Sequence, residues 1–154
     1  MLKKFLSTCV ALGTLLSPVL SVSAESPTPL TAGRLIKASA TAVYWYTGDH
    51  RYAFPNEETF YSWFSPYDFG RILRISDEQM MAIPIGNNVT YRPGSRLVKI
   101  SADVRVYAVD GRGTLRPINS ESVARDLYGD NWAQFIDEIP DAFFLNYRIG
   151  TMIN

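Results

Sequence analysis

Residues 33–60 read GRLIKASATAVYWYTGDHRYAFPNEETF, and this stretch decides the fold because the chain repeats it. The second copy, residues 95–123, reads SRLVKISADVRVYAVDGRGTLRPINSESV. Matched residues lie 62 positions apart at first, as in Arg34 and Arg96, and 63 positions apart after one inserted residue. Self-similarity at a fixed spacing is the signature of a repeated structural unit.

The first copy predicts a β-hairpin, a third strand and a helix. Valine and aromatic residues favour short strands at residues 35–38, 42–46 and 51–54, and a glycine suits the turn between the last two. Asn56 is a good N-cap for a helix over residues 57–64, whose aromatic side chains we interpret as core. This copy therefore contains the elements of a small α+β unit.

The second copy predicts the same elements in the same order. Strands are expected at residues 96–100, 104–109 and 114–118, followed by a helix over residues 120–128 with Asn119 as its cap. The repeated order indicates that both copies fold alike.

Three further segments connect or follow these elements. Ser76 begins a capping-box pattern and predicts a short helix. Residues 89–92 are a strand candidate. Residues 146–150 echo residues 88–94, so we interpret the last residues of the chain as the start of a third copy.

These patterns predict an α+β fold of two tandem units of about 60 residues. Unit 1 spans residues 33–94 and unit 2 spans residues 95–154. Each unit is expected to hold a hairpin or three-stranded sheet with one or two short helices. Because about 60 residues bury little apolar surface alone, we expect the two units to share a core.

Residues 1–24 have the pattern of a secretory signal peptide. Lys3 and Lys4 precede an apolar run, and small residues stand before Glu25. The alternative is an uncleaved membrane anchor. Cys9, the only cysteine, lies inside this segment, so the mature chain would contain no disulfide.

Export is therefore predicted, to the cell surface or the medium, or to the periplasm of a Gram-negative source. Residues 25–32 are rich in Pro, Ser and Thr and are interpreted as a short tether. No later stretch is apolar enough to span a membrane. Loss of residues 1–24 removes two of fifteen basic residues and no acidic one, which leaves a charge of −2 and does not indicate a nucleic-acid partner.

Four short motifs carry a resemblance to known sequences: GRLIK at residues 33–37, FPNE at 54–57, YRPG at 91–94 and IPDAFF at 139–144. The pattern resembles a repeat module in exported proteins of candidate-phylum and other environmental bacteria. The resemblance covers residues 33–153. It implies a secreted or cell-surface setting and assigns no catalytic residue.

Catalytic and metal sites are not indicated by the residue types. His50 is the only histidine, and without a mature cysteine a closed structural zinc site is excluded. A glycosidase would need two carboxyls facing each other, and neighbouring carboxylates in the sequence point in different directions, so such a pair would be built across the units. The adjacent carboxylate pairs are Glu57-Glu58, Asp77-Glu78 and Asp137-Glu138. We predict no catalytic residue, no metal ligand and no cofactor.

The candidate ligand-binding residues are Tyr44, Trp45, Tyr46 and His50, in the first hairpin. Three consecutive aromatic residues on a strand cannot all face one core, so some rings face outward or toward the other unit. Exposed rings stack on sugars or pack on partners, whereas the alternative is that they fill the interface between the units. The last three of these residues have no aromatic or histidine counterpart in the second copy.

The sequence therefore favours a non-enzymatic secreted or cell-surface module that attaches to, or recognises, a cell-envelope polymer or partner. The partner would be a cell-envelope polysaccharide or a surface protein. One alternative is a structural spacer or surface-assembly unit, which predicts self-association. The other is a carboxylate-dependent hydrolase.

Overall fold

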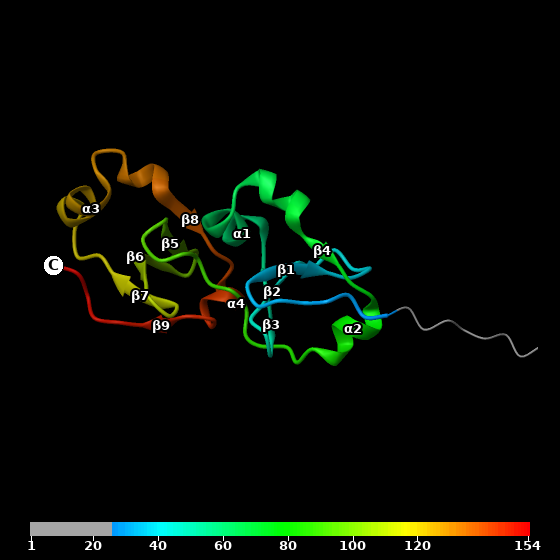
Figure 1. Cartoon of the computed structure of the whole chain (residues 1–154). Coiled ribbons are helices and arrows are strands. Elements are labelled where there is room, and N and C mark those ends of the chain that lie inside the picture. Colours follow the sequence, from blue (N-terminus) through cyan, green and yellow to red (C-terminus); the bar gives the residue numbers. More distant parts are fainter. Residues whose placement is uncertain (1–25) are drawn as a thin grey trace, which may run out of the picture.

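A computed structural model describes residues 26–154 of the chain. The predicted signal peptide, with Cys9 and the cleavage position before Glu25, lies outside the described residues. Figure 1 shows two halves side by side, each with its own β-sheet, and the C-terminus on the far side of the second half.

The first half contains a four-stranded sheet in the order β3-β2-β1-β4. Neighbouring strands β1, β2 and β3 are antiparallel, whereas β4 is parallel to β1. The elements of this half are β1 (Arg34–Lys37), β2 (Tyr44–Tyr46), β3 (Arg51–Ala53), α1 (Glu57–Trp63), the 3-10 helix η1 (Pro66–Arg71), β4 (Leu73–Arg74) and α2 (Asp77–Ala82).

The second half contains a five-stranded sheet in the order β8-β5-β6-β7-β9. Its central meander is antiparallel, and the two outer strands are parallel to their neighbours. The elements of this half are β5 (Leu97–Ile100), β6 (Asp103–Asp110), β7 (Thr114–Pro117), α3 (Glu121–Tyr128), the 3-10 helix η2 (Trp132–Phe135), β8 (Ile136–Glu138), α4 (Asp141–Phe144) and β9 (Arg148–Ile149).

The predicted α+β fold of two similar sheet-bearing halves is confirmed. Strand β4 lies beside β1 as β8 lies beside β5, and equivalent hydrogen bonds close the two ladders. The Ile75 amide donates to Lys37 O at 3.0 Å, and the Ile139 amide donates to Lys99 O at 2.9 Å. Both isoleucines are buried, so each half repeats the same strand-to-core arrangement.

The C-terminal residues complete the second half. The Gly150 amide donates to Leu115 O at 2.8 Å, as the Gly86 amide donates to Arg51 O at 2.8 Å. The prediction that these residues begin a third copy is therefore wrong. Their backbone hydrogen bonds match those of residues 85–89, which lie 64 positions earlier in the chain.

The helix caps show where the repeat spacing changes. Asn56 caps α1 as predicted, and its side chain accepts from the Thr59 amide at 2.9 Å. In the second half the cap is Ser120, which accepts from the Val123 amide at 3.4 Å, so the prediction of Asn119 is wrong. The two caps are 64 positions apart, because the second hairpin contains one more residue.

The short helix predicted after Ser76 is confirmed as α2, whereas residues 89–92 form no strand. Only Val89 bonds to a strand backbone, with its amide donating to Ala53 O of β3 at 2.8 Å, and the residues after it bond to side chains. The Tyr91 amide donates to the Tyr147 hydroxyl at 3.1 Å, and the Arg92 amide donates to Ser62 Oγ at 3.0 Å. The segment therefore fixes the two halves to each other.

The core is divided between the halves. Buried residues of the first cluster are Ile36, Ala38, Ile75, Met80 and Ile83. Buried residues of the second cluster are Tyr91, Val98, Ile100, Tyr107, Val109, Leu115 and Ile139. Tyr91, which the predicted boundary assigns to unit 1, lies in the core of the second half. The described residues therefore form two separate buried clusters instead of the one shared core that was predicted.

The segment predicted as a tether packs against the first half over its described part. The Thr28 amide donates to Gln79 Oε1 at 3.0 Å, and Gln79 Nε2 donates to Thr28 O at 2.6 Å. Leu30 packs against the first core cluster. Residues 28–30 are therefore part of the fold of the first half.

Candidate functional site

The three consecutive aromatic residues of β2 cover both faces of the first sheet. Trp45 packs against α1, with ring centroids 5.1 Å from Trp63 and 5.6 Å from Phe64. Tyr44 and Tyr46 lie against the first core cluster on the opposite face, as strand alternation requires. All three are half-buried, so they do not form one exposed platform.

His50 belongs to a turn whose polar groups bond to one another. The His50 Nδ1 atom lies 3.1 Å from the Asp49 carboxylate, and Thr47 Oγ1 donates to Asp49 Oδ1 at 2.9 Å. The hydrogen bonds from Thr47 and then His50 lower the pKa of Asp49. The Tyr46 hydroxyl donates to Gly48 O. The structure thus connects the predicted residues Tyr46 and His50 through one turn.

A surface groove of about 390 Å³ lies beside α1, and we call it the aromatic groove. Its lining residues are Thr41, Ala42, Val43, Phe54, Pro55, Asn56, Glu57, Phe60 and Phe69. Phe69 stacks on Phe60 with ring centroids 4.6 Å apart and is 39% exposed. The groove combines an accessible ring with the polar side chains of Thr41, Asn56 and Glu57, a combination typical of ligand sites.

The 3-10 helix η1 holds Phe69 at this position. The Ser65 amide donates to Asp68 Oδ2 at 2.8 Å, and Arg71 Nη1 donates to Asp68 Oδ1 at 3.1 Å. These bonds, the Ser65 amide first, lower the pKa of Asp68 and favour its charged form. Asp68 therefore stabilises the turn that presents Phe69 against Phe60.

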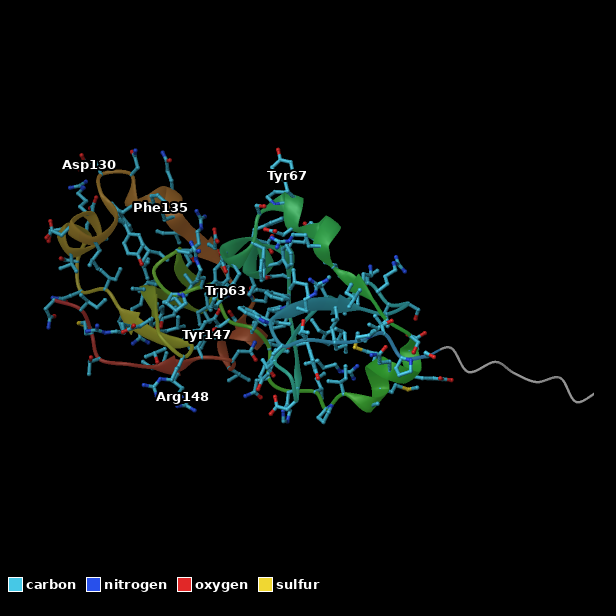
Figure 2. The ribbon with its side chains drawn as sticks, viewed as in Figure 1. Trp63, Tyr67, Asp130, Phe135, Tyr147 and Arg148 are labelled. Carbon is cyan, nitrogen blue, oxygen red and sulfur yellow. The ribbon has the colours of Figure 1, made fainter. Side chains whose placement is uncertain are left out.

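Two tyrosines extend the aromatic surface beyond this groove. Tyr61 is 41% exposed, and its ring centroid lies 5.8 Å from that of Phe69. Tyr67 is 92% exposed, and Figure 2 shows it pointing away from the fold. Sequence reasoning missed Tyr61 because it treated the aromatic residues of the predicted helix over residues 57–64 as one core stripe, and Tyr67 lies outside that helix. Tyr61 directly follows Phe60, about 100° further round the helix, which was the available signal.

A second groove of about 450 Å³ lies where the two halves meet, and we call it the junction groove. Its lining residues are Glu58, Tyr61, Ser62, Arg92, Ser95, Arg96 and Asp137. Arg96 donates to both carboxylate oxygens of Asp137, with Nε 2.9 Å from Oδ2. The hydrogen bond with Asp137 raises the pKa of Arg96, and the bidentate geometry fixes both side chains in place.

Direct hydrogen bonds fix the two sides of the junction groove. Trp63 Nε1 donates to Thr90 O at 2.8 Å, and Figure 2 shows Trp63 between the halves. Ser62 Oγ donates to Thr59 O at 2.7 Å while it accepts the Arg92 amide. Trp45 contacts Trp63, so strand β2 of the first hairpin packs against the α1 side chain that bonds to Thr90.

The Tyr91 side chain is 1% exposed, and its hydroxyl has no hydrogen-bond partner among residues 26–154. Burial raises the pKa of this hydroxyl, and the negative charges of Asp137 and Glu58 raise it further. Both carboxylates line the junction groove. The hydroxyl is therefore a buried, neutral group that interacts with Asp137 of the groove.

Comparison with family models, with curated proteins and with solved structures finds no match to this chain. Within residues 26–154, no helix is long and apolar enough to cross a bilayer. The same range contains no group of three His, Cys, Asp or Glu residues placed to hold a metal ion.

Proposed function

We propose that the chain is a non-enzymatic, exported module that attaches to or recognises a polysaccharide of the cell envelope through the aromatic groove. The observation that supports this most is the partly exposed Phe69 ring, stacked on Phe60 above a groove with a polar rim. Aromatic faces pack against the apolar faces of sugars. Thr41, Asn56 and Glu57 can bond to sugar hydroxyls.

The signal-peptide pattern of residues 1–24 and the resemblance to exported repeat modules support the proposed location at the cell surface or in the medium. In a Gram-negative source the location would be the periplasm. At these locations polysaccharide is an abundant partner, and it suits the aromatic groove because this groove lacks concentrated charge. A surface protein is the alternative partner.

Binding is favoured over hydrolysis by the surroundings of the carboxylates. The aromatic groove is lined by one carboxylate, Glu57, whereas a glycosidase needs two facing carboxyls. Glu58 and Asp137 both line the junction groove, but Arg96 engages both oxygens of Asp137. That pairing leaves one free carboxylate in each groove.

Retention on insoluble cell-envelope polysaccharide tests the proposal. The wild-type chain should be retained, and Phe69→Ala should weaken retention roughly tenfold, because it removes one stacking ring. Tyr67→Ala is the matched control, since Tyr67 lies in the same 3-10 helix but does not line the groove. Self-association without retention would contradict the proposal and favour the spacer alternative.

A further inference from the structure

The junction groove contains two charged side chains of opposite sign that lack an ion pair among residues 26–154, namely Glu58 and Arg92. Glu58 comes from α1 of the first half, and Arg92 comes from the segment before β5. The other two charges, Arg96 and Asp137, satisfy each other. The groove thus offers one free anion and one free cation to a ligand.

The neutral groups around these charges also suit a small polar ligand. The exposed Tyr61 ring forms an apolar wall, and the hydroxyls of Ser62 and Ser95 line the same groove. These groups offer hydrogen bonds and an apolar contact beside the two charges.

We propose that the junction groove binds a zwitterionic ligand that carries an ammonium and a carboxylate, as a free amino acid or a short peptide does. Arg92 binds the carboxylate, because a guanidinium pairs with it through two parallel hydrogen bonds. The Glu58 carboxylate accepts hydrogen bonds from the ammonium group. The ligand side chain packs on the Tyr61 ring.

The charge balance of the groove excludes simpler ligands. A plain anion would pair with Arg92 but would be repelled by Glu58, and a plain cation would meet the reverse arrangement. A zwitterion satisfies both charges at once. This inference does not rest on polysaccharide binding, because Arg92 and Glu58 do not line the aromatic groove. A glycan that bears short peptides would engage both grooves.

Calorimetric titration of the exported chain with alanyl-alanine tests the zwitterion requirement. The free dipeptide should bind, whereas N-acetyl-alanyl-alanine and alanyl-alanine amide, each lacking one charge, should bind roughly tenfold or more weakly. Equal binding of the free and acetylated dipeptides would assign a simple anion site and overturn the proposal. Absence of binding by the free dipeptide would also overturn it.

Variants of exposed residues test which side chains bind the two charges. Glu58→Gln and Arg92→Gln should each weaken dipeptide binding roughly tenfold. Glu57→Gln is the matched control, because Glu57 lies in the same helical turn but lines the aromatic groove. Unchanged dipeptide affinity in Glu58→Gln and Arg92→Gln would contradict the assignment. Circular dichroism verifies that each variant is folded, and retention on polysaccharide should stay unchanged in Glu58→Gln and Arg92→Gln.

Discussion

Gly150 shows how close packing selects a residue without a side chain. A Cβ at this position would lie 2.7 Å from Thr114 Cγ2 and 3.2 Å from Arg116 Cγ. Thr114 is β-branched and stiff at χ1, so it cannot move aside freely. A Cβ at Gly86, the equivalent residue of the first half, would lie 2.5 Å from the Tyr52 ring. The tight approach at both glycines therefore belongs to the repeated fold.

The first prediction concerns this contact. Gly150→Ala should lower the free energy of unfolding by about 1–3 kcal/mol, because the added methyl group overpacks the strand pair. Urea unfolding measures the change. Gly70→Ala is the control, since a Cβ there meets no atom within 4 Å. Equal stability of the two variants would contradict the overpacking explanation.

The second prediction concerns the unsatisfied hydroxyl of Tyr91. Tyr91→Phe keeps the ring in the second core cluster and removes a buried polar group without a partner among residues 26–154. Its free energy of unfolding should therefore rise by about 1 kcal/mol. Urea unfolding at neutral pH measures this change. A loss of stability would show that the hydroxyl makes a stabilising hydrogen bond.

At the scale of elements, the N-cap of α3 shows whether the two copies of the repeat are 63 positions apart at this point, as predicted, or 64. Ser120→Ala should lower the free energy of unfolding by about 1 kcal/mol, because Ser120 caps α3. Asn119→Ala, one residue earlier, should have little effect, since the Asn119 side chain makes no hydrogen bond within residues 26–154. A larger loss for Asn119→Ala would contradict the cap assignment.

Some elements could be predicted from the sequence because their signals are local. The first hairpin, α1 and α2 follow from strand-forming residues, a turn glycine and the capping residues Asn56 and Ser76. Strands β4 and β9 could not be predicted, because each has two residues and forms only by pairing with a distant parallel neighbour. Two residues are too few to show an alternating pattern.

The same difference between local signals and long-range contacts applies to the candidate site. Sequence reasoning identified the first half as the more aromatic and chose Tyr44, Trp45 and Tyr46, whose rings pack on both faces of a sheet. The partial exposure of Phe69 depends on the course of the 3-10 helix η1. The junction groove depends on how the halves are placed, which no local pattern encodes.

At the scale of the whole molecule, buried tyrosines make stability depend on alkaline pH. Burial is the main cause of the raised pKa of Tyr91, Tyr107, Tyr128 and Tyr147. In the unfolded chain these groups lose protons near pH 10, their ordinary pKa, while the folded chain retains them. The stabilisation is complete below roughly pH 10 and is lost as the pH rises further.

Urea unfolding at a series of alkaline pH values measures this dependence. The free energy of unfolding should fall above roughly pH 10, and Tyr147→Phe should make the fall less steep. Tyr67→Phe, at a position that is 92% exposed, should leave the slope unchanged. A flat pH dependence would contradict the burial of these hydroxyls.

The central claim is that the aromatic groove binds a cell-envelope polysaccharide, and a nuclear magnetic resonance titration with soluble oligosaccharides from that polymer tests it most directly. Backbone amide signals should shift at the groove, in residues 41–43 and in Phe54, Asn56, Glu57, Phe60 and Phe69, while signals of α3 should stay in place. Unshifted groove signals at saturating oligosaccharide, or shifts confined to the second half, would contradict the claim.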